Sequence, residues 1–217
     1  MQSKNNNPLR IRTRMHNRLE SRIGILYLTT RMKLFRRHTT PEDLGARLYE
    51  ALRSGLESKG DLSSDRLLES IDLSPETLDE NYRGEVIVGL MFAAVLAVER
   101  SATPRLVHQI TAGMKAEFLS HLEEQGASPL QRAEWENVLA ARFLDYRKSL
   151  EEYTGFEPPW KLGRAFYWNI LGEEAYTAMA IKIATLYLSA ARDHCQQVLN
   201  EEGPYLLPDR TPPHHSS

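Results

Sequence analysis

The sequence contains almost no cysteine and no apolar run long enough to cross a membrane. Cys195 is the only cysteine in 217 residues, so an internal disulfide framework is excluded. A single cysteine fits a reducing compartment, and we expect a cytoplasmic protein. The longest apolar run covers residues 86–98, which is shorter than the roughly 20 residues that span a bilayer. We therefore expect a soluble protein with no transmembrane segment, in which residues 86–98 form a buried helix.

Short motifs that carry catalysis or nucleotide binding are also missing. The sequence has no Gly-x-Gly-x-x-Gly, Walker or Gly-x-Ser-x-Gly pattern. Cys195 stands alone near a predicted helix C-terminus, where the helix dipole opposes a thiolate. Glu117 and His121, one turn apart, are interpreted as an exposed surface pair, and the consecutive Asp193 and His194 point in different directions around a helix. We predict no catalytic residue, no metal site and no cofactor, and we lean against an enzyme.

What the sequence does contain is a repeated helical pattern. Leu44, Leu48, Leu52 and Leu56 recur every four residues, which places one apolar face along a helix. Ser or Thr before Pro is a frequent helix start, because the hydroxyl caps the first turn and proline suits the first helical position. Such pairs occur four times, at 40–41, 74–75, 103–104 and 128–129. Gly60, Gly126 and Gly203 follow periodic segments and are predicted helix stops.

These signals predict an all-α, single-domain bundle of about six helices around the buried apolar helix 86–98. The helical segments are expected at 41–59, 64–72, 75–101, 104–125, 129–153, 159–171 and 173–201, with a break at Gly84 inside the third. Because the connections are short, we expect neighbours in sequence to pack as antiparallel hairpins. The bundle is assigned to residues 40–203, between a basic extension (1–39) and a flexible tail with prolines (204–217).

The N-terminal extension differs in charge from the rest of the chain. Residues 1–40 contain ten Lys or Arg and one acid, a net of +9, so the remaining residues carry −11 of the total −2. One interpretation is a disordered or dispensable extension, with Met32 as the native start. Another is an arm that binds the phosphates of nucleic acid or an anionic lipid surface. The candidate residues for that contact are Arg10, Arg12, Arg14, Arg18 and Arg22.

Residues 156–168 are the most distinctive segment, with five aromatic side chains in thirteen residues. The aromatic residues 166–168 are consecutive, so they spread around a helix and at least one must be partly exposed. Aromatic and arginine side chains are enriched at the energetic centres of interfaces. The candidate interaction surface therefore consists of Phe156, Trp160, Arg164, Tyr167 and Trp168.

The sequence favours a protein–protein interaction module, an adaptor, chaperone-like or regulatory protein that binds a protein partner or a second copy of itself. The first alternative is a nucleic-acid-associated protein that uses the basic arm. The second alternative is a ligand-binding or enzymatic domain with a pocket near the aromatic segment, at Trp160, Tyr167 and Trp168.

Overall fold

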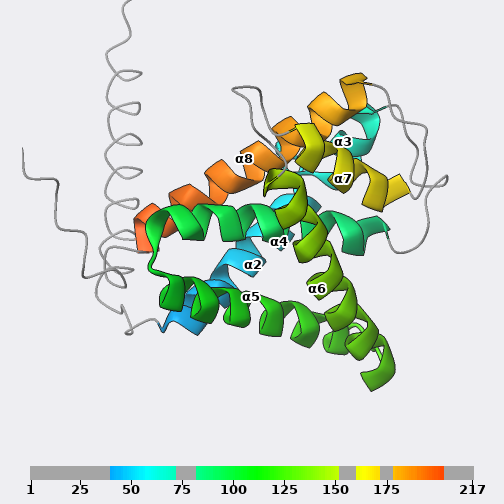
Figure 1. Ribbon diagram of the computed structural model, residues 1–217. Helices are drawn as coiled ribbons and strands as arrows, with labels where there is room; N and C mark the ends of the chain where they lie inside the picture. Colours follow the sequence, from blue (N-terminus) through cyan, green and yellow to red (C-terminus); the bar gives the residue numbers. More distant parts are fainter. Residues whose placement is uncertain (1–39, 72–81, 152–159, 172–177, 203–217) are drawn as a thin grey trace, which may run out of the picture. The chain divides into compact units, whose positions relative to one another are not determined.

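The computed structural model describes residues 40–71, 82–151, 160–171 and 178–202. The chain divides into two units, Met1–Thr39 and Thr40–Ser217, and the described residues all belong to the second. That unit contains α2 (Pro41–Glu57), α3 (Ser64–Ser70), α4 (Tyr82–Ser101), α5 (Pro104–Glu124), α6 (Pro129–Glu151), α7 (Trp160–Leu171) and α8 (Ala178–Glu202). Figure 1 shows these helices with the labels used below.

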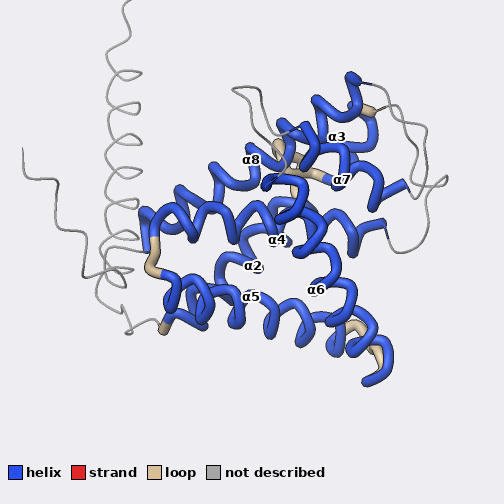
Figure 2. The backbone as a smooth tube through the Cα atoms, viewed as in Figure 1, coloured by secondary structure: helices blue, strands red, loops and turns tan. Residues whose placement is uncertain are grey.

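The predicted all-α class is confirmed. Within the described ranges the structure contains helices and short connections and no strand (Figure 2). Seven helices are present there, rather than about six. None of them combines the length and the apolar character needed to cross a lipid bilayer.

The central helix α4 is buried as predicted. Between Val86 and Val98 every side chain is buried except Leu96, which is half-buried. A helix that is apolar on all sides must be surrounded by other helices, and α4 contacts α2, α5, α6, α7 and α8. The predicted break at Gly84 is wrong, because α4 runs without interruption from Tyr82. Residues 75–81 of the predicted third helix lie outside the described residues.

Helix starts follow the expected capping chemistry. Thr40 and Asp43 form a capping box, in which each backbone N–H donates to the other side chain at 3.1 Å. Ser128 and Gln131 form the same reciprocal pair at 2.8 and 3.3 Å. Thr103 is the N-cap of α5, but its side chain makes no capping hydrogen bond. The Ser–Pro pair at 74–75 lies outside the described residues, so it defines no observed start.

Of the three glycines predicted to end helices, Gly126 is the one that the described structure shows in this role. Gly126 has φ +89°, and the N–H groups of Gly126 and Ala127 donate to the carbonyl oxygens of Glu123 and Leu122 at 2.9 Å. These two bonds make a Schellman motif, which needs a left-handed residue and therefore favours glycine. Gly60 is not a left-handed stop, because α2 already ends at the cap residue Ser58. Gly203 lies outside the described residues.

The expectation that sequence neighbours pack as hairpins holds only in part. The two most extensive pairings, α2 with α5 and α4 with α8, join helices that are not neighbours, whereas the third, α7 with α8, joins neighbours. At the α2–α5 crossing, a Cβ atom on Gly45 would collide with the Ile110 carbonyl oxygen, and one on Gly113 would collide with the Glu42 carbonyl oxygen. The absence of a side chain at these two glycines therefore permits the close approach of the α2 and α5 backbones.

Candidate functional site

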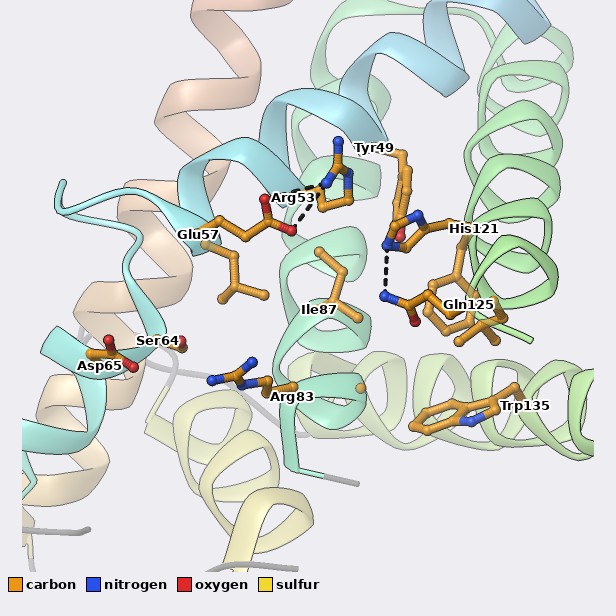
Figure 3. A pocket seen from close by; sticks show the side chains of 14 residues that line it. Tyr49, Arg53, Glu57, Ser64, Asp65, Arg83, Ile87, His121, Gln125 and Trp135 are labelled. Carbon is orange, nitrogen blue, oxygen red and sulfur yellow. Dashed lines mark hydrogen bonds and ion pairs between the residues drawn. The ribbon is translucent and has the colours of Figure 1, made fainter. Parts of the chain in front are cut away.

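A polar cavity of about 540 Å³ lies between α2, α3, α4, α5 and α6 (Figure 3). Its volume falls within the range of about 300–1,000 Å³ typical of small-molecule sites. Side chains from five helices line it, so the cavity exists only because the fold brings distant segments together. We call it the α2–α6 cavity.

Aromatic side chains form part of its wall. The rings of Tyr49 and Phe118 meet edge to face, with centroids 6.0 Å apart and planes at 69°. Phe118 meets Trp135 in the same way, at 5.8 Å and 81°. The indole of Trp135 fills the space that a side chain on Gly84 would occupy. Only glycine at position 84 leaves room for the Trp135 ring, which explains why the continuous helix α4 contains a glycine here.

Arg53 is held in place by two carboxylates. Its Nη2 donates to Glu50 at 2.8 Å and its Nη1 donates to Glu57 at 3.0 Å, while its Nε also donates to Glu50 at 3.2 Å. The hydrogen bond from Arg53 lowers the pKa of Glu50. Because all three nitrogens of this guanidinium are engaged, Arg53 shapes the cavity but offers few donors to a ligand.

Two other groups keep hydrogen-bonding capacity toward the cavity. Tyr49 is only 2% exposed, yet no described residue donates to or accepts from its hydroxyl. Burial raises the pKa of Tyr49, so the hydroxyl keeps its proton. Arg83 donates through Nε to the Tyr82 hydroxyl at 3.0 Å, and its two terminal nitrogens have no partner among the described residues. Tyr49 and Arg83 can therefore bind an added molecule without first breaking a contact.

His121 and Gln125 lie on the opposite side of the cavity from Asp65 in Figure 3. The Nε2 atoms of His121 and Gln125 are 3.1 Å apart, and the His121 Nδ1 is 3.8 Å from the Glu124 carboxylate. An amide nitrogen donates to an imidazole nitrogen only when that nitrogen has no proton. This arrangement therefore suits the tautomer with its proton on Nδ1, toward Glu124.

The second notable surface is the outward face of α6. Its inward face packs through Trp135, Leu139, Phe143 and Tyr146. The opposite face carries five exposed residues without charge. We call this set the outer stripe of α6, and it consists of Leu130, Ala133, Asn137, Ala141 and Leu144. Leu130 is 70% exposed and Leu144 is 69% exposed, so the stripe presents apolar surface that nothing in the described part of the chain covers.

No protein-family model, curated protein or solved structure matches this chain.

The predicted aromatic surface is split between core and solvent. Trp168 is 40% exposed and Arg164 is also exposed, whereas Trp160 is half-buried. Tyr167 is 4% exposed and lies in the core, and Phe156 lies outside the described residues. The expectation that at least one of the three consecutive rings is partly exposed is confirmed by Trp168. The aromatic segment therefore offers a smaller outward face than its composition indicates.

A second cavity, of about 400 Å³, lies between α4, α6, α7 and α8. Neither it nor the α2–α6 cavity is lined by Trp160, Tyr167 or Trp168, so the ligand pocket predicted there is not one of these two. The arginines at positions 10, 12, 14, 18 and 22 lie outside the described residues, and their contact with nucleic acid or lipid stays a prediction.

Metal-binding arrangements do not occur among the described residues, where no three His, Cys, Asp or Glu side chains gather. Cys195 is fully buried, and burial raises its pKa to about 12. The direction of that shift is the one expected from the sequence, and its cause is desolvation of the thiol by the surrounding core.

Sequence reasoning missed both the α2–α6 cavity and the outer stripe. The spacing of Glu50, Arg53 and Glu57 is a signal for an ion-pair cluster on one helix face. Arg83 carries no such local signal, because its environment comes from other helices. For the outer stripe, the recurrence of Leu130 and Leu144 is visible in the sequence, but it becomes informative only once the opposite face is known to be the buried one.

Proposed function

We propose that this protein is a protein–protein interaction module and that the outer stripe of α6 is its contact surface. The supporting observation is that Leu130 and Leu144 are 70% and 69% exposed on the outward face of α6. Monomeric proteins rarely expose contiguous apolar patches without a functional reason. The exposed residues Glu134 and Lys148 lie one turn from Leu130 and Leu144 on the same face, and Glu136 lies beside it, so polar groups accompany the apolar side chains, as in known interfaces.

A second copy of the chain is the partner that fits this stripe best. Read in either direction, the stripe is Leu, Ala, Asn, Ala, Leu, with spacings of three, four, four and three residues around Asn137. Two antiparallel α6 helices related by a two-fold axis would place Leu130 against Leu144 of the other copy. Such an isologous contact closes on itself and gives a dimer. Asn137 would meet its own copy, where each amide can donate to and accept from the other.

The expected dimer is weak. Full burial of a leucine contributes about 1.5–3 kcal/mol, so four leucines that are each about 70% exposed contribute about 4–8 kcal/mol. Association itself costs about 4–15 kcal/mol. The net free energy of association is then at best about −4 kcal/mol, which corresponds to a dissociation constant of about 1 mM. An affinity of this size suits reversible association.

Sedimentation velocity of the full chain over about 10 µM to 1 mM tests this proposal. We expect concentration-dependent dimerisation that the double variant L130E/L144E abolishes, because it places four like charges in the contact. Leu186→Glu is the matched control, since Leu186 is a 58% exposed leucine on α8. A chain that remains monomeric at the highest concentration, or a dimer unaffected by L130E/L144E, contradicts self-association.

Cysteine cross-linking tests the antiparallel geometry separately. In an antiparallel pair, position 137 meets its own copy, whereas position 130 lies about 21 Å from its own copy at 1.5 Å per residue. Asn137→Cys should therefore form a disulfide-linked dimer on oxidation, and Leu130→Cys should not. The native Cys195 does not interfere, because it is fully buried. Equal cross-linking at both positions would indicate parallel helices.

A further inference from the structure

We propose that the α2–α6 cavity binds a small zwitterion of the amino-acid type, with an ammonium and a carboxylate on one carbon and an apolar side chain. The proposal is independent of the outer stripe of α6, because no residue is shared between the two surfaces. It rests on the placement of Arg83 and Asp65 at one end of a cavity that also presents the apolar side chains of Ile87 and Trp135 (Figure 3).

Arg83 is the carboxylate-binding group. Its terminal nitrogens carry four N–H donors that no described residue uses. A planar guanidinium with open donors matches the two oxygens of a carboxylate in a bidentate arrangement. Arg53 cannot take this role without giving up Glu50 or Glu57, whose carboxylates already occupy its nitrogens.

Asp65 is the ammonium-binding group. Its side chain is exposed at the edge of the cavity and has no hydrogen bond to a described residue. The proximity of Asp65 contributes to the raised pKa of Arg83, after the larger effect of the Tyr82 hydroxyl. The two open charges therefore belong to the same end of the cavity.

The charge balance selects a zwitterion over a simple anion or cation. The permanently charged lining groups are two arginines and two acids, Arg53 and Arg83 with Glu57 and Asp65, so they sum to zero. An anion at Arg83 would leave Asp65 as a like charge beside it, and a cation at Asp65 would meet Arg83 in the same way. A ligand that carries both charges satisfies both residues.

Three apolar side chains of the wall suit an apolar ligand body, and Tyr49 adds a polar contact. Ile87, Phe118 and Trp135 provide apolar surface, and Phe118 and Trp135 already meet edge to face. Tyr49 also lines this cavity, and its side chain is only 2% exposed. Because the Tyr49 hydroxyl has no partner among the described residues, it can donate to or accept from a ligand atom without losing another contact.

Calorimetric titration of the full chain tests the proposal with four probes: L-phenylalanine, 2-phenylethylamine, 3-phenylpropionate and inorganic phosphate. We expect L-phenylalanine to bind with a dissociation constant of about 1 mM or tighter. The amine and the acid each keep one charge and the ring, and they should bind about tenfold more weakly or not at all. Phosphate should not bind. Equal binding of 3-phenylpropionate and L-phenylalanine would overturn the zwitterion in favour of an anion site.

Two pairs of variants locate the binding. Arg83→Met and Asp65→Asn should each weaken L-phenylalanine binding about tenfold or more. Their controls are Arg105→Met, at an exposed arginine of α5, and Glu69→Gln, on the same helix as Asp65; neither residue lines the cavity. Circular dichroism of each variant verifies the fold. If no probe binds, or if the controls lose as much affinity as the cavity variants, the proposal is wrong.

Discussion

The close approach of the α2 and α5 backbones at Gly45 gives a decisive test of the packing. Gly45 of α2 faces the Ile110 carbonyl oxygen and the Met114 backbone nitrogen of α5. An alanine Cβ at this position would overlap both atoms. Backbone atoms cannot rotate aside as a flexible side chain can, so Gly45→Ala must push α2 and α5 apart or distort one of them.

Two opposing effects determine the size of the change. Alanine is a better helix former than glycine by about 1 kcal/mol, which favours the variant. Overpacking typically costs about 1–3 kcal/mol and more when it strains backbone. We expect the overlap to dominate and the free energy of unfolding to fall by about 2 kcal/mol, because separating α2 from α5 also loosens Leu44 and Leu48, which are 1% and 0% exposed.

Gly55→Ala in the same helix is the matched control. A Cβ there would lie 3.1 Å from the Leu62 side chain, which can shift by a few tenths of an ångström. Urea unfolding followed by circular dichroism should give a lower midpoint for Gly45→Ala than for Gly55→Ala, with similar slopes. A Gly45→Ala variant as stable as the parent chain would refute the close crossing of α2 and α5.

Four further predictions concern single groups. Because the pKa of Cys195 is raised from about 8.5 in the unfolded chain to about 12 in the fold, its contribution to stability is full below pH 8.5 and declines as pH rises toward 12. Urea unfolding between pH 9 and pH 10 should therefore show a steeper loss for the parent chain than for Cys195→Ala, by up to about 1.4 kcal/mol per pH unit. Arg142 donates to both oxygens of Glu85 at 2.9 and 2.8 Å, so Arg142→Met should lower the free energy of unfolding by about 1–3 kcal/mol, and adding Glu85→Gln should recover part of it in a double-mutant cycle. Trp168→Ala should lose about 1–2 kcal/mol, less than the about 3–5 kcal/mol of a fully buried ring, because the side chain is 40% exposed; a larger loss in thermal unfolding would assign the ring to the core. Deletion of residues 1–39 should abolish any salt-sensitive binding to arbitrary DNA or RNA, measured by fluorescence anisotropy, if the basic arm makes that contact.

Local features of the fold could be predicted from the sequence. Thr40 with Asp43 and the glycine at position 126 act within a few residues of themselves, so their spacing is sufficient to place a helix start and a helix stop. The burial of residues 86–98 also follows from composition alone, since a helix that is apolar on every side has no face suited to water.

Helix pairing could not be predicted in the same way. Gly45 and Gly113 look like weak helix positions when each is considered alone, and only their mutual approach shows that they join α2 to α5. The expectation of sequential hairpins relied on short connections and did not consider which faces are complementary.

The α2–α6 cavity was beyond sequence reasoning for a related reason. Asp65 and Arg83 belong to different helices, and no local spacing in the sequence fixes the distance between them. The outer stripe of α6 was visible as leucines fourteen residues apart, but leucine at helical spacing usually indicates core. Only the observed burial of Leu139 and Tyr146 on the other face shows that Leu130 and Leu144 face solvent.

The pairing of α2 with α5 also bears on how the chain reaches its fold. The most extensive partner of α2 begins at Pro104, about fifty residues after α2 ends at Glu57. Contacts between distant segments form late, because the entropic cost of closing a long loop comes before the contacts can stabilise the chain. During synthesis from the N-terminus, Leu44, Leu48 and Leu52 would emerge before the helix that covers them. The apolar face of α2 is therefore a surface that a nascent chain of this protein must protect until α5 has been synthesised.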